Sequence, residues 1–102
     1  MNTRIPVRIR VGAKLYSIDV VESMRRKRDM GRTYYNDSRI EIGKRSNVTG
    51  RAYTVDEMDD TFWHELTHAI LYEMQHNLYD DEKFVTEFAG RLAKAIKSAQ
   101  FK

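Results

Sequence analysis

The chain has 102 residues, of which 41% are hydrophobic and 32% charged, and 18 Lys and Arg against 15 Asp and Glu give a net charge of +3. This length suits one domain with one core, and the composition is that of a soluble globular protein. No apolar run approaches the roughly 20 residues of a membrane helix, and the N-terminus lacks a signal peptide's apolar core. Because cysteine is absent, disulfides, cysteine-ligated zinc and a thiol nucleophile are excluded. We expect a cytoplasmic protein.

The first half of the chain is predicted to form strands and turns. Val7, Ile9 and Val11 alternate with arginines, which is typical of a half-buried strand. A turn at Gly12 leads into a second strand over residues 15–21, so that the two form a hairpin. Beyond them we expect a short helix, a second hairpin and a polar loop, over residues 22–29, 33–42 and 43–53.

The second half is predicted to form two helices. Thr54 and Glu57 have the spacing of a capping box, and the first helix should run to about Gln75. Asp80 or Asp81 should cap the last helix. Apolar residues at helical spacing should face the core; they are Val55, Met58, Phe62, Leu66, Ala69 and Ile70 in the first helix, and Phe84, Val85, Phe88, Leu92, Ile96 and Ala99 in the last. The sequence therefore predicts an α+β fold in which a small antiparallel sheet packs against two helices.

A run of four basic residues, 25–28, stands out in the first half. Such a run can contact nucleic acid, but a block this short is more often a solvated face. No interleaved aromatic residues strengthen the nucleic-acid interpretation. We therefore expect neither nucleic acid nor a membrane as a partner.

The most informative segment contains His64, Glu65 and His68. Histidines four residues apart lie on one face of a helix, so both imidazoles can bind one tetrahedral zinc ion. Glu65 lies about 100° further round the helix, where its carboxylate can reach a zinc-activated water without binding the metal. Two of the chain's three histidines fall in this motif, within an independently predicted amphipathic helix. The pattern predicts a zinc site with Glu65 as general base.

A third zinc ligand has to come from outside the motif. Leu71 and Met74 occupy the places where a metzincin has its glycine and third histidine, and His76 lies too late. The remaining candidates are acidic residues after the motif helix: Asp80, Asp81, Glu82 and Glu87. Helical phase places Glu87 away from the apolar stripe and Asp81 and Glu82 near it. We favour Glu82 because glutamate has the longer reach, and Asp81 is the alternative.

The segments HELTHAILYEM and DDEKFVTEFAGRLAKAI resemble gluzincin-type minimal metallopeptidases of phage and prophage genomes, which are distantly related to ImmA/IrrE-like peptidases. The resemblance covers about the last half of the chain. It implies that residues 1–102 form one zincin-like domain that acts in the host-cell cytoplasm, with a two-His, one-Glu zinc site completed by Glu82. It also implies that a peptide substrate lies antiparallel along an edge strand, for which residues 39–42 are the best candidate.

The expected function is zinc-dependent hydrolysis of a peptide or protein substrate. Tyr34, Tyr35 and Tyr53 are candidates to stabilise the oxyanion, although each also suits packing. So small a domain can supply only one wall of a deep cleft, so a partner protein can add specificity. The alternative is a non-enzymatic, zinc-containing regulator that binds nucleic acid or a host protein. An intact Glu65 argues against it, because a structural site has no use for that acid.

Overall fold

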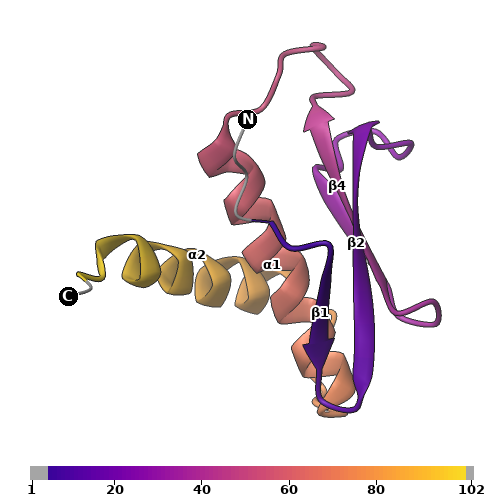
Figure 1. Ribbon diagram of the computed structural model, residues 1–102, viewed down its shortest axis with the longest axis vertical. Helices are drawn as coiled ribbons and strands as arrows, with labels where there is room; N and C mark the ends of the chain where they lie inside the picture. Colours follow the sequence, from indigo (N-terminus) through magenta and orange to yellow (C-terminus); the bar gives the residue numbers. More distant parts are fainter. Residues whose placement is uncertain (1–4, 101–102) are drawn as a thin grey trace.

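The computed structural model describes residues 5–100, which form four strands followed by two helices. The elements are β1 (Arg8–Val11), β2 (Lys14–Ser23), β3 (Gly31–Tyr34), β4 (Arg39–Arg45), α1 (Val55–Glu73) and α2 (Glu82–Ser98) (Figure 1). The predicted α+β class is confirmed. Within the described range, neither helix is both long and apolar enough to cross a membrane.

The sheet is mixed, so the predicted antiparallel sheet is wrong. Its strand order is β1-β2-β4-β3. The β1–β2 and β3–β4 pairs are antiparallel hairpins, whereas β2 pairs with β4 in parallel. The sheet is mixed because β3 does not pair with β2. The strand β4, which follows β3 in the sequence, lies between β2 and β3. This pairing joins residues far apart in sequence, and local turn signals do not indicate it.

The loop between β2 and β3 replaces the short helix predicted over residues 22–29. Met24 is buried and anchors the start of the loop. The Asn47 side-chain amide then donates to the carbonyls of Met24 and Arg26, both at 2.8 Å, and its oxygen accepts from the backbone N–H of Arg28 at 2.9 Å. Arg28 has a left-handed φ of 73°, which a helix does not permit. A single side chain therefore fixes the path of this loop.

One face of the sheet packs against α1 to form the core. Ile40 and Ile42 of the central strand β4 have no exposed surface. The other main core residues are Tyr16 and Ile18 of β2 and Met58, Phe62, Leu66 and Ala69 of α1. The predicted inner face of α1 is confirmed at these four α1 positions. Ile70, however, is 41% exposed.

The segment 43–45 continues β4, where a polar loop was predicted.

The helix α2 packs on α1 and extends away from the sheet (Figure 1). Its buried residues are the small Val85, Ala89 and Ala93, spaced four apart. The larger Phe84 and Phe88, predicted to face the core, are 36% and 48% exposed. Small side chains let the two helix backbones approach closely, and this close packing decides which face of α2 is turned inward.

The predicted capping box at the start of α1 is confirmed. The Thr54 side chain accepts from the Glu57 N–H at 3.1 Å, and the Glu57 carboxylate accepts from the Thr54 N–H at 2.9 Å. The Arg51 guanidinium binds the same carboxylate at 3.0 Å. The Arg51 hydrogen bond, with that of the Thr54 backbone, lowers the pKa of Glu57 to about 2. These contacts set where α1 begins, and hence where the motif lies along it.

We predict that Thr54→Ala lowers the free energy of unfolding by about 1 kcal/mol, because the first turn of α1 loses its side-chain acceptor. Urea denaturation followed by circular dichroism measures the change. Thr86→Ala is the matched control, since Thr86 is exposed within α2 and should cost nothing. Equal stability of the parent and Thr54→Ala would contradict the role of this cap.

Candidate metal centre

His64 and His68 lie one turn apart on the same face of α1, as their spacing predicted. Their ring centroids are 4.9 Å apart, with the ring planes at 67°. The side chain of His68 is 6% exposed and that of His64 is 25% exposed, so His64 lies nearer the solvent. The two Nε2 atoms face a common point beside the helix, where both contact the same carboxylate.

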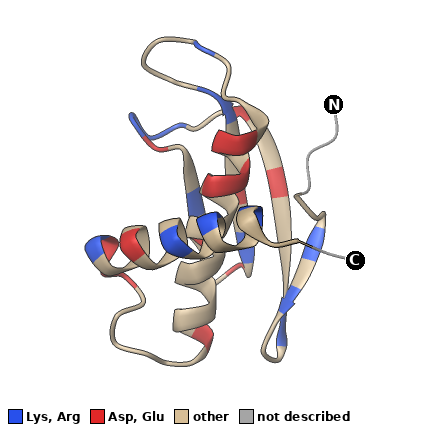
Figure 2. Cartoon of the chain, turned by 90° about the vertical axis from the view of Figure 1, so that its left-hand side faces the viewer, with Lys and Arg blue, Asp and Glu red and all other residues tan. Residues whose placement is uncertain are grey.

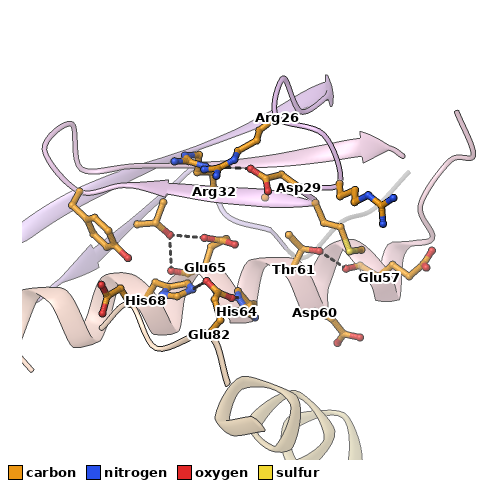
Figure 3. A pocket seen from close by; sticks show the side chains of 16 residues that line it. Arg26, Asp29, Arg32, Glu57, Asp60, Thr61, His64, Glu65, His68 and Glu82 are labelled. Carbon is orange, nitrogen blue, oxygen red and sulfur yellow. Dashed lines mark hydrogen bonds and ion pairs between the residues drawn. The ribbon is translucent and has the colours of Figure 1, made fainter. Parts of the chain in front are cut away.

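That carboxylate belongs to Glu82, the first residue of α2. Its Oε1 lies 3.0 Å from His64 Nε2 and its Oε2 lies 2.9 Å from His68 Nε2. One ligand atom from each of the three side chains lies within 4.8 Å of the others. The helix α1 ends at Glu73, slightly before the predicted end, and Gln75 has a left-handed φ of 59° that turns the chain. The predicted three side chains are thus brought together (Figure 3).

The other acidic candidates for the third ligand do not join this group, although Asp80 lines the same cleft. Asp81 is the N-cap of α2, and its carboxylate accepts from the Phe84 N–H at 3.0 Å. Glu87 is exposed and does not belong to the group of three. His76 is also separate, because its Nδ1 accepts from the Leu78 N–H at 3.1 Å. Among the sequence candidates, only Glu82 meets both motif histidines.

A backbone carbonyl orients His68 from the far side of its ring. His68 Nδ1 donates to the Tyr79 carbonyl oxygen at 2.6 Å. Because a carbonyl can only accept, Nδ1 carries the proton and Nε2 points toward Glu82. The Tyr79 ring packs against Tyr35 and Tyr72, with centroids 5.4 and 5.3 Å away, which fixes the loop that supplies the carbonyl. Sequence reasoning missed this contact, since a backbone acceptor has no signature in the sequence.

The donor set fits a divalent cation. A neutral imidazole has a single N–H, and the Tyr79 carbonyl takes that of His68. The lone pair on His68 Nε2 then faces a carboxylate oxygen of Glu82 at 2.9 Å. These two acceptors repel each other, and a cation bound between them would remove the repulsion. Imidazole oriented by a second hydrogen bond is the usual form of a metal-bound histidine. His64, His68 and Glu82 together match the two-His, one-Glu set of catalytic zinc sites.

Glu65 points from α1 toward β3 and is 7% exposed. The Thr33 hydroxyl lies 2.8 Å from Glu65 Oε1 and 3.0 Å from the Glu65 backbone oxygen. Burial raises the pKa of Glu65, while the Thr33 hydrogen bond and the neighbouring histidines act in the opposite direction. Sequence analysis did not single out Thr33, because its pairing with Glu65 depends on how the sheet meets the helix.

The backbone of β3 lies very close to α1 beside Glu65. A Cβ at Gly31 would lie 2.6 Å from Thr61 Cγ2, 2.9 Å from the Glu41 carbonyl oxygen and 3.2 Å from Glu65 Cγ. Real Cβ atoms do not tolerate the first two distances, so only glycine fits without displacing the strand. Gly31 therefore lets β3 approach the helix closely enough for Thr33 to reach Glu65.

A cleft of about 770 Å³ lies between α1, β3 and the loop before β3 (Figure 3). His64, Glu65, His68 and Glu82 line it, with residues of β3 opposite. The edge-strand prediction at residues 39–42 is wrong, because β4 lies inside the sheet and β3 is the edge strand next to α1. Residues 39–42 were expected at an edge because the sequence did not indicate that β4 lies between β2 and β3.

Backbone groups of β3 are open toward its free edge. The Gly43 N–H donates to the Met30 carbonyl at 2.9 Å, just before β3 begins. In an antiparallel ladder alternate residues point to the partner strand, so Gly31 and Thr33 direct their N–H and C=O groups away from β4. An extended peptide can pair with these groups.

Of the three tyrosines proposed for the oxyanion, Tyr35 is the one that lines the cleft. Burial raises its pKa, so the phenol remains protonated and can donate a hydrogen bond. Tyr34 instead donates to Glu41 at 3.1 Å. Tyr53 packs against the core, with Arg51 5.6 Å from its ring. Tyr34 and Tyr53 therefore have structural contacts of their own.

Comparison with known proteins gives no relative: no protein-family model, curated protein or solved structure matches the chain. The metallopeptidase family and the zincin-like packing implied by residues 64–74 and 80–96 therefore remain predictions. We infer function from the side chains that line the cleft and from their geometry.

We predict about one zinc ion per chain, lost in His64→Ala and His68→Ala, because both imidazoles face the same point. Metal analysis of protein purified without chelator measures the ratio. His76→Ala is the control, as its ring lies outside the group. Protein that takes up no zinc at neutral pH would contradict the metal centre.

The third ligand gives a separate prediction. Glu82→Ala should weaken zinc binding by about 10-fold or more, as loss of one protein ligand removes part of the coordination energy. Glu87→Ala, on the same helix but outside the group, should leave the affinity unchanged. Competition with a chromogenic chelator gives both affinities. If Glu87→Ala loses more zinc affinity than Glu82→Ala, the assignment of Glu82 as the third ligand is wrong. If Asp81→Ala loses more than Glu82→Ala, Asp81 is the third ligand.

Proposed function

We propose that this protein is a zinc-dependent peptidase in which His64, His68 and Glu82 hold the metal and Glu65 is the general base. One observation carries the proposal: two imidazoles and a carboxylate from different helices converge on a cleft that also contains a buried glutamate. A structural ion pair would explain the first three residues, but it gives no reason for Glu65 to line the same cleft.

The donor set favours zinc among the common metals. Imidazole nitrogen suits zinc better than it suits calcium or magnesium, which prefer oxygen ligands. Three protein ligands leave a coordination position free, as catalytic zinc sites do, whereas structural sites usually have four. A bound zinc ion would lower the pKa of a coordinated water and polarise the carbonyl of the peptide bond to be cleaved.

Glu65 performs the proton transfers in this mechanism. Its carboxylate accepts a proton from the attacking water and later donates it to the nitrogen of the departing amine. Thr33 holds the carboxylate through the 2.8 Å hydrogen bond, which limits the directions in which Glu65 can turn. Tyr35 is suited to donate a hydrogen bond to the oxygen that develops negative charge.

The free edge of β3 is suited to hold a substrate in extended form. Gly31 and Thr33 offer backbone donors and acceptors beside Glu65, and strand addition of this kind gives affinity without fixing the side chains of the peptide. A peptide or unfolded protein segment is therefore the proposed substrate. Because the chain is small, a protein partner can complete the cleft and add specificity.

The main test replaces Glu65 with glutamine, which keeps the size of the side chain and its ability to accept from Thr33. We expect Glu65→Gln to fold and bind zinc like the parent but to lose peptide cleavage by about 10²–10⁴-fold, the usual cost of removing a general base. Mass spectrometry of a proteome-derived peptide library measures cleavage, alongside zinc content and thermal unfolding. Glu87→Gln is the control, since Glu87 is exposed on α2 away from the group.

The same test separates the enzyme from the alternative, a non-enzymatic zinc-containing regulator. Equal cleavage by the parent and Glu65→Gln would mean that Glu65 is not the base. Absence of cleavage in both, with zinc bound, would favour the regulator. Loss of zinc in Glu65→Gln would mean that this residue supports the metal centre and that the mechanism is wrong.

A further inference from the structure

Basic side chains gather at one end of the cleft. Arg26 and Arg28, from the loop between β2 and β3, line it together with Arg32 of β3. Figure 3 shows Arg26 and Arg32 on the sheet side of the cleft, across from the first turns of α1. Figure 2 shows the charged residues along the described part of the chain, with the acidic first turns of α1 in red. The run at residues 25–28 thus contributes to the wall of the site.

Arg26 and Arg28 differ from the other charged side chains at this end of the cleft in having no ion pair among residues 5–100. Each acidic side chain here has a basic partner: Glu57 with Arg51, Asp60 with Lys97 and Asp29 with Arg32, at 3.0, 2.8 and 3.3 Å. Among residues 5–100, by contrast, the ion pairs of these acids include neither Arg26 nor Arg28. The two guanidinium groups at this end of the cleft are therefore available to a carboxylate of a ligand.

The loop that carries these arginines has a defined shape. The Asn47 side chain makes three hydrogen bonds to the backbone of the loop. The side chain of Met24, the first residue of the loop, is buried. The Asp29 N–H also closes a turn onto the Arg26 carbonyl at 3.1 Å. A preformed loop loses less conformational entropy when it binds a ligand, so it makes a better binding surface than a loose basic tail.

The position of the loop relates it to a bound peptide. Gly31 lies beside Thr61, and the Tyr35 ring stacks on Tyr72 at 4.4 Å, so β3 and α1 run in the same direction along the cleft. The loop that carries Arg26 and Arg28 therefore lies at the end where β3 begins. A peptide that pairs with β3 in the antiparallel direction passes Glu65 and then reaches the loop at the start of β3.

We propose that the cleft selects substrates with an acidic segment, whose carboxylates bind Arg26 and Arg28. This inference deepens the proposed peptidase function and rests on it. Guanidinium groups bind carboxylates through two parallel hydrogen bonds, which gives such a subsite geometric selectivity. Because antiparallel pairing is the more stable arrangement and β3 begins at the loop, the acidic residues follow the cleaved bond in the substrate.

A binding experiment tests the charge preference without requiring cleavage. Zinc-loaded Glu65→Gln protein is titrated against a short fluorescein-labelled peptide with alternating glutamates and against its glutamine counterpart, with fluorescence anisotropy as the readout. We expect the glutamate peptide to bind about 10-fold more tightly at low salt, with the difference shrinking as salt increases. Arg26→Gln with Arg28→Gln should abolish the difference, and Arg26→Lys with Arg28→Lys should retain part of it.

The matched control is Arg8→Gln with Arg10→Gln, which removes the same charge from β1 at the opposite edge of the sheet. This control should bind the glutamate peptide like the parent. Equal affinities for the two peptides, or equal losses in the two double variants, would overturn the inference. Tighter binding of a single-stranded oligonucleotide through Arg26 and Arg28 would also overturn it, in favour of a nucleic-acid surface.

Cleavage by the active enzyme distinguishes failure of this inference from failure of the proposed function. In the peptide library, Asp and Glu should be enriched after the cleaved bond, and Arg26→Gln with Arg28→Gln should remove the enrichment, whereas Arg8→Gln with Arg10→Gln should retain it. Cleavage without any acidic preference would overturn the inference alone. Absence of cleavage, with selective binding of the glutamate peptide, would contradict the peptidase function while the acidic-segment site stands.

Discussion

The contact between β3 and α1 is the constraint on which the candidate site depends. Gly31 allows the strand to approach the helix, and Thr33 then binds both the side chain and the backbone of Glu65. The same contact sets the direction in which Glu65 points, and the histidines take the adjacent face of the helix. One wall of the cleft is therefore the edge strand itself. A shift of β3 would displace Glu65 and the free edge of the sheet together.

The parts of the site that were predicted from the sequence are local in the chain. His64, Glu65 and His68 lie within two turns of one helix, and a capping box fixes where that helix begins. The preference for Glu82 over Glu87 also needed only the phase of one helix, and Glu82 meets both histidines. Helical periodicity is strong enough to place side chains that are neighbours along one element.

The features that the sequence did not predict depend on contacts between distant segments. The insertion of β4 between β2 and β3 made the sheet mixed and moved the exposed edge from residues 39–42 to β3. Thr33 reaches Glu65 through the contact between β3 and α1, and the Tyr79 carbonyl reaches His68 from the loop between the two helices. On α2, Val85 is buried as predicted, but Phe84, Phe88 and Ile96 are exposed, because close packing on α1 selects Val85 and the alanines.

The division of the donor set between two helices has a thermodynamic consequence. His64 and His68 belong to α1, whereas Glu82 belongs to α2, which is held to α1 through small side chains. The full set exists only when the helices are docked, so binding of a metal ion there would be linked to docking of α2. A cation bound to both helices would hold α2 on α1 and lengthen the lifetime of the folded chain. Metal scarcity would then loosen α2 and leave the protein more open to degradation, so its abundance would follow the supply of metal.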